Sequence, residues 1–241
     1  MSEASLNLSP IINVMQAPIQ RYAERIQELG GTNALTLMLF GSIAAGSFDP
    51  RHHTARSVLV LQTVDLEMLR QFAKDGAKLG KARIAAPLIM TPDYIDASVD
   101  VFPLEFIEIQ QRHLCVFGPD HFEGLSFDPT HVRLQCEREL KTLLISMRQA
   151  LLSAAGHEKL FKTIEADVAD RLIRTLRGLL WLHEKKEGLS AQQTIEEVER
   201  KTNHALPGLR DAIQETGQHG WTEFQSLYNE IDALRKLVDA W

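Results

Sequence analysis

The sequence predicts an α+β protein in which a small mixed-sheet domain is followed by an all-α helical bundle. In the first half, short apolar runs alternate with helical segments, whereas from residue 126 onward apolar residues recur every three or four positions. The character changes within "GPDHFEGLSFDPT", residues 118–130. We therefore expect two domains, 1–125 and 126–241, which suits a chain of 241 residues.

The elements of the first domain follow from the length and period of its apolar runs. An apolar stripe that ends at Gly30-Gly31 predicts a helix over 10–30. The runs at 34–40 and 57–63 are short and continuous, which fits buried strands. Further along, helical spacing predicts a helix over 65–81 and an apolar run predicts a third strand over 87–91.

Two more strands are expected before the boundary. Residues 104–110 alternate, which predicts a fourth strand, and 113–118 read as a short fifth. On the fourth strand, Glu108 would share one face with Leu104 and Phe106, and Glu105 would lie on the other.

Helix signals dominate the second domain. Asp128 is a good capping residue and Pro129 suits the first helical position, so a long helix should begin there. A second helix is expected over 158–186. "SAQQ" (190–193) and "TEFQ" (222–225) have the pattern of capping boxes, which predicts two further helix starts.

Composition limits the function classes. The net charge of −6 argues against a protein that coats nucleic acid. The sequence has no apolar run long enough for a membrane helix and no signal-peptide pattern, so we expect no membrane partner and a cytoplasmic location. Cys115 and Cys136 have no CxxC or Cys/His metal spacing and are expected to be buried thiols.

The stretch "LFGSIAAGSFDPRHHTARSVLVLQT", residues 39–63, carries the strongest chemical signal. A glycine after a buried strand lets the backbone approach a polyphosphate, and amides and the Ser42 hydroxyl would donate to its oxygens. Two acids on the next strand, one residue apart, would point to the same face and hold Mg²⁺ against the phosphates.

On Gly41, Ser42 and Gly46, and on the order of its elements, the sequence resembles the nucleotidyltransferase superfamily with the polymerase-beta-like fold. That family's signature is Gly-Ser, then roughly nine to thirteen residues, then Asp-x-Asp on the second strand. A helical bundle often follows the catalytic domain. The resemblance implies this fold, a nucleotide substrate and Mg²⁺ as cofactor.

The sequence departs from the signature at its metal ligands. Aligning "SVLVL" on the family's pattern puts Val58 and Val60 at the two aspartate positions and leaves 15 residues, 43–57, after Ser42. Valine cannot bind Mg²⁺, and no shift within 57–63 supplies an acid. We therefore expect a degenerate metal site, with Mg²⁺ required only if the protein is active.

Other charged residues could serve the site. Asp49, Glu105 and Glu108 are the candidate catalytic carboxylates, although Asp49 also fits simple turn chemistry before Pro50 and the two glutamates could be salt-bridge partners. Arg51 and Arg56 could bind an anion where a metal is missing, or belong to a solvated loop.

Three functions remain open from the sequence. The first is a degenerate nucleotidyltransferase-like protein that binds a nucleotide or another phosphorylated ligand without normal transfer, through Gly41, Ser42, Gly46, Arg51 and Arg56. The second is an active nucleotidyltransferase that modifies a small molecule or a protein with unorthodox carboxylates. The third is a non-enzymatic module whose helical bundle binds a protein partner or self-associates.

Overall fold

The computed structural model describes residues 6–184, 188–214 and 219–239. The chain divides into two compact units. The first, the sheet unit, contains the residues up to Val99 together with Glu108–Ser126. The second, the helical unit, contains Asp100–Ile107 and the residues from Phe127 onward. Residues 100–107, which the sequence analysis placed in the first domain, thus pack with the helices.

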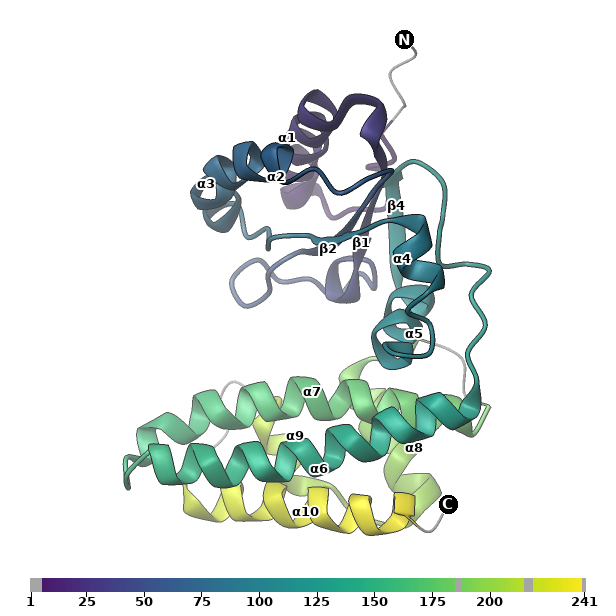
Figure 1. Cartoon of the computed structure of the whole chain (residues 1–241). Helices are drawn as coiled ribbons and strands as arrows, with labels where there is room; N and C mark the ends of the chain where they lie inside the picture. Colours follow the sequence, from purple (N-terminus) through teal and green to yellow (C-terminus); the bar gives the residue numbers. More distant parts are fainter. Residues whose placement is uncertain (1–5, 185–187, 215–218, 240–241) are drawn as a thin grey trace. The chain divides into compact units, whose positions relative to one another are not determined.

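A four-stranded mixed sheet forms the centre of the sheet unit, as predicted (Figure 1). Its spatial order is β3-β2-β1-β4. The strands are β1 (Ala34–Phe40), β2 (Arg56–Leu61), β3 (Leu88–Met90) and β4 (His113–Phe117). β1 pairs antiparallel with both β2 and β4, whereas β2 and β3 are parallel.

Helix α1 (Asn13–Gly30) covers one face of this sheet. Its buried residues Ile19 and Ile26 join Leu37, Leu39 and Leu59 in one apolar core. The Tyr22 hydroxyl crosses to the Ser57 hydroxyl of β2 at 2.8 Å, which pairs two buried polar groups. Val14, near the start of α1, is exposed and does not contribute to this core.

The remaining helices of the sheet unit are short. The single helix expected over 65–81 is instead α2 (Leu66–Phe72), a 3₁₀ turn (Ala73–Asp75) and α3 (Gly76–Lys81). Gly76 and Gly80 lower the helical propensity there, consistent with the break. A short helix, α4 (Pro92–Asp96), follows β3, and the Thr91 side chain caps it by accepting from the Tyr94 amide.

The strand predicted over 104–110 is wrong, because these residues form helix α5 (Pro103–Gln111). Pro103 suits a helix start, and the Gln135 side chain accepts a hydrogen bond from the Leu104 amide at 2.9 Å. Residues 104 and 106–109 are all buried. The alternation of residue types along this segment therefore does not correspond to an alternation of buried and exposed side chains, as it would in a strand. The sheet therefore has His113–Phe117 as its fourth strand, in the segment that we expected to be a fifth.

The helical unit contains five α-helices among its described residues from Phe127 onward (Figure 1). They are α6 (Pro129–Ser153), α7 (Phe161–Leu182), α8 (Ala191–Thr202), α9 (Pro207–Ala212) and α10 (Trp221–Asp239). A 3₁₀ turn, Glu158–Leu160, precedes α7; residues 185–186 of the helix predicted over 158–186 lie outside the described residues. No helix in the described part of the chain is long and apolar enough to span a membrane.

Two of the three predicted caps of the helical unit are confirmed. The Asp128 side chain accepts from the Thr130 amide at the start of α6. Ser190 and Gln193 form a complete capping box at the start of α8. The box expected at Thr222 is wrong, because α10 begins at Trp221, two residues before the start that a Thr222 cap implies.

Candidate ligand site on the sheet

A row of three residues crosses the sheet on the face opposite α1. Phe40, the last residue of β1, pairs with Arg56 of β2 on one side and with His113 of β4 on the other. Paired residues point to the same face of a sheet, so the three side chains lie next to each other. Gly41 follows Phe40 directly, so the Gly-Ser turn begins beside the middle residue of this row.

The Gly-Ser turn is a 3₁₀ turn, Gly41–Ile43. Gly41 and Gly46 have φ of 77° and 71°, a conformation that favours glycine, so the backbone conformation accounts for both residues. The Gly41 amide donates to the Arg112 carbonyl at 3.1 Å, so it is already used within the fold. Among the described residues, the Ser42 hydroxyl has no hydrogen-bond partner, so it can donate to a ligand.

Two contacts fix the position of the Arg56 side chain. Its guanidinium lies 4.4 Å from the centre of the Phe40 ring, a cation–π geometry. Its Nη1 lies 3.5 Å from Glu108 Oε1, and the Glu108 side chain is only 9% exposed whereas that of Arg56 is 38% exposed. The guanidinium therefore keeps part of its surface accessible while its position is fixed.

The next positions on the same face are apolar. Val58 pairs with Met38, which pairs in turn with Cys115 of β4. Val58, Val60 and Met38 are all fully buried. β2 therefore presents Arg56, Val58 and Val60 to this face and carries no acidic residue.

Asp49 and Arg51 form a local turn. The Asp49 carboxylate accepts the Arg51 amide at 2.9 Å and the Arg51 guanidinium at 2.6 Å. Hydrogen bonds from the Arg51 side chain and then from its amide hold the pKa of Asp49 well below its usual range. This carboxylate and guanidinium satisfy each other, as the turn interpretation of the sequence expects.

The two glutamates of α5 belong to different units. Glu108 belongs to the sheet unit, next to Arg56. Glu105 belongs to the helical unit, where its Oε2 accepts from the Gln135 side chain at 2.7 Å and its Oε1 lies 3.9 Å from Arg174. Of the predicted site residues, the structure thus brings together Gly41, Ser42, Arg56 and Glu108.

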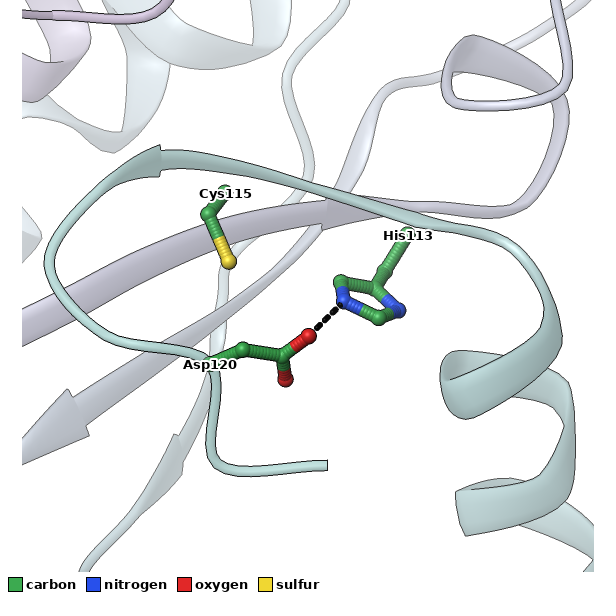
Figure 2. Close-up of side chains that lie close together, drawn as sticks. All are labelled: His113, Cys115 and Asp120. Atoms are coloured by element: carbon green, nitrogen blue, oxygen red, sulfur yellow. Dashed lines mark hydrogen bonds and ion pairs between the residues drawn. The ribbon is translucent and has the colours of Figure 1, made fainter. Parts of the chain in front are cut away.

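A cluster that the sequence analysis missed lies at the other end of the row. His113, Cys115 and Asp120 place their donor atoms within 4.8 Å of one another (Figure 2). Cys136 is buried as expected, but Cys115 is only half-buried. The sequence contained one signal for this cluster, since His113 and Cys115 are alternate residues of a predicted strand. The spacing of residues could not show that the loop after this strand brings Asp120 back to them.

The fold is that of nucleotidyltransferases. The structure resembles the crystal structure of spectinomycin adenyltransferase AAD(9) from "Enterococcus faecialis" with ATP and spectinomycin, with a TM-score of 0.59. The match covers 92% of this chain and 98% of that chain at 9% sequence identity. No protein-family model matches the sequence, and no curated protein matches it by sequence. A likeness at this identity establishes the fold alone.

Proposed function

We propose that this chain is a nucleotidyltransferase-like protein that binds a nucleotide or another phosphorylated ligand at the Gly41-Ser42 turn without normal transfer chemistry. The observation that carries the proposal is the composition of the β2 face. In place of paired acids it offers Arg56, next to the turn and partly exposed.

Charge explains why this arrangement suits a bound anion. In a Mg²⁺-dependent site, carboxylates and phosphates share the cation. Here the guanidinium supplies positive charge and planar donors to phosphate directly, and Glu108 and Phe40 hold it in place. The Ser42 hydroxyl adds a donor at the turn.

The three candidate carboxylates do not fit a Mg²⁺ platform. Asp49 is satisfied by Arg51, Glu108 lies against Arg56, and Glu105 is bonded to Gln135. The proposed binding of a ligand therefore does not involve Mg²⁺. An active transferase with unorthodox carboxylates would have to break at least one of these contacts.

The test is thermal unfolding against a panel of nucleoside triphosphates, each with EDTA and with Mg²⁺. A ligand present at a hundred times its Kd stabilises the folded protein by about 2.7 kcal/mol. We expect a rise in Tm that persists in EDTA and is smaller in Ser42→Ala. Ser47→Ala, which removes an exposed hydroxyl five residues further along the same loop, is the matched control and should retain the full rise.

The other outcomes separate the alternatives. A rise that requires Mg²⁺, with incorporation of label from an α-labelled triphosphate, would contradict our proposal and establish an active transferase. A Tm that no phosphorylated ligand changes would contradict binding at the turn.

Self-association is the second candidate function, and it concerns the helical unit alone. Between α6 and α10, a groove of about 250 Å³ is lined by Arg148, Leu151, Phe224 and Tyr228. Trp221, also on this groove, is 47% exposed. An exposed tryptophan beside an apolar groove suits contact with a second copy of the chain. Sedimentation at rising concentration tests it: a dimer that Trp221→Glu dissociates is expected, and a monomer at all concentrations would exclude it.

A further inference from the structure

The His113–Asp120 contact requires a hydrogen between its two atoms. His113 Nδ1 lies 2.9 Å from the Ile109 carbonyl, which only accepts, so Nδ1 carries a hydrogen. Nε2 lies 2.6 Å from Asp120 Oδ2, another acceptor. A hydrogen therefore lies between these two atoms when no metal ion is bound, and a metal ion would take its place and hold the two atoms farther apart.

The Cys115 thiol completes a set of three donors. His113 and Cys115 are alternate residues of β4, so both side chains leave the strand on the same face. Sγ, the imidazole and the carboxylate lie within 4.8 Å of one another, with Asp120 reaching back from the loop (Figure 2). A tetrahedral Zn²⁺ ion holds its donors roughly 3–4 Å apart, so small rotations of these side chains would accommodate one.

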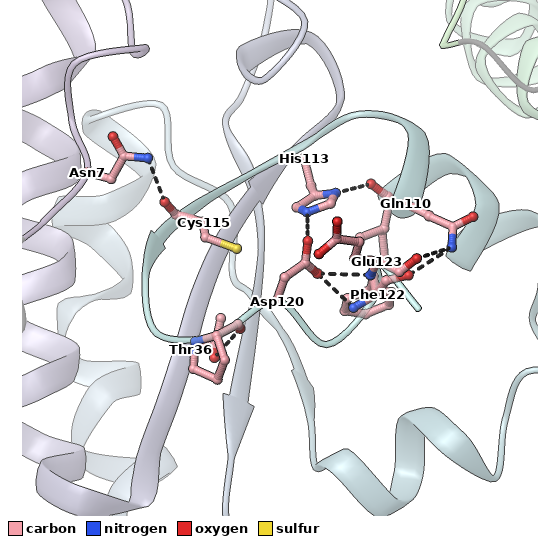
Figure 3. Close-up of polar contacts among 10 residues, drawn as sticks. Asn7, Thr36, Gln110, His113, Cys115, Asp120, Phe122 and Glu123 are labelled. Atoms are coloured by element: carbon pink, nitrogen blue, oxygen red, sulfur yellow. Dashed lines mark hydrogen bonds and ion pairs between the residues drawn. The ribbon is translucent and has the colours of Figure 1, made fainter. Parts of the chain in front are cut away.

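Hydrogen bonds to the sheet, to α5 and within the loop itself hold the loop that carries Asp120 in place (Figure 3). Asp120 Oδ1 accepts the Phe122 amide at 2.8 Å, which orients the carboxylate and leaves Oδ2 toward the imidazole. The Thr36 hydroxyl donates to the Pro119 carbonyl, and Gln110 Nε2 donates to the Phe122 carbonyl. Gly118, with φ of 80°, starts the return of the chain and packs so closely on Leu35 and Thr36 that a Cβ would not fit.

We propose that His113, Cys115 and Asp120 form a binding site for a divalent transition-metal ion of the Zn²⁺ class, with water in the fourth position. Thiolate and imidazole are the ligands that Zn²⁺ prefers, whereas Mg²⁺ selects oxygen, so this site differs in chemistry from the one that the fold family implies. The bond from His113 Nδ1 to the Ile109 carbonyl is the usual outer contact of a metal-bound imidazole.

A divalent cation at this position would neutralise one thiolate and one carboxylate together. None of its three ligands belongs to the Gly-Ser turn.

The test is titration of the untagged, metal-stripped chain with Co²⁺ and Zn²⁺. We expect one Co²⁺ per chain with a thiolate-to-cobalt charge-transfer band, displacement of Co²⁺ by Zn²⁺, and a rise in Tm with Zn²⁺. Cys115→Ser and Asp120→Asn should each weaken binding by at least about 100-fold, since even loss of an outer contact costs about 10- to 100-fold. Asp120→Asn keeps an oxygen for the Phe122 amide, so it preserves the loop contact.

Cys136→Ala is the matched control, because it removes the other thiol, which is buried in the helical unit. It should bind Co²⁺ with the unchanged band. Absence of saturable binding in the parent chain, or one equivalent of Co²⁺ retained in folded Cys115→Ser, would overturn the proposal.

Discussion

The two faces of the sheet are built from alternate residues of the same strands, yet they carry different kinds of contact. The face under α1 is an apolar core that contains one neutral polar pair, Tyr22 and Ser57. The opposite face carries Arg56 with Glu108 at one end of the Phe40 row and His113 with Asp120 at the other. Both faces bury apolar side chains, but only the second also holds charged groups that a ligand or ion could use.

The largest expected effect comes from the apolar face. Leu59→Ala should lower the free energy of unfolding by about 2–5 kcal/mol, because it leaves a cavity at a fully buried position. Denaturant unfolding measures it. Leu88→Ala on β3 is the control: Leu88 is 42% exposed, so its loss should be within about 0.5 kcal/mol. Equal losses would contradict this assignment of the core.

The next effect tests the asymmetry of the Arg56–Glu108 pair. Arg56→Met removes the guanidinium beside a buried carboxylate and should cost about 2 kcal/mol of unfolding free energy. Glu108→Gln leaves a partly exposed guanidinium that water can solvate, so we expect less than about 1 kcal/mol. Chemical denaturation of both variants checks this, and the reverse order would mean that Glu108 is not held by Arg56.

A smaller effect is expected for the polar pair under α1. Tyr22→Phe removes the hydroxyl that meets Ser57 and should cost about 1 kcal/mol of unfolding free energy. A double-mutant cycle with Ser57→Ala isolates the interaction, because the two losses should not add. Strict additivity would show that the hydrogen bond contributes nothing to stability.

Near neutral pH, the smallest contribution to the free energy of unfolding is expected from the titration of the Cys115 thiol. Its pKa is raised in the folded protein to about 11 from 9.0, so its contribution to stability is complete below pH 9 and is lost as pH rises toward 11. In the metal-free protein, alkylation by iodoacetamide should therefore be slow near neutral pH and accelerate toward pH 11. Acceleration already near pH 8, as in an unfolded chain, would contradict the burial of this thiol.

Local signals in the sequence were enough for most of the fold. The length of the apolar runs identified β1 and β2, and Asp128-Pro129 located the start of α6. The error at 104–110 arose because buried residues on every side of a short helix imitate a strand, although Pro103 was a helix signal.

The site was predictable only where its parts are adjacent in sequence. The Gly-Ser turn and Arg56 follow from one stretch of the chain. The contacts of Arg56 with Glu108 and of His113 with Asp120 depend on how α5 and the loop after β4 return to the sheet. No spacing rule encodes that return.

The central claim is that Arg56 takes the place of a metal in binding phosphate, and calorimetric titration with ATP tests it most directly. The claim predicts a Kd that is the same within about twofold in EDTA and in Mg²⁺, and that rises at least about tenfold in Arg56→Gln/Glu108→Gln, a double variant that removes both charges of the pair. Arg70→Gln on α2, which removes an exposed arginine paired with Glu67, should leave the Kd unchanged. Binding that appears only with Mg²⁺, or that survives the loss of Arg56, would contradict the claim.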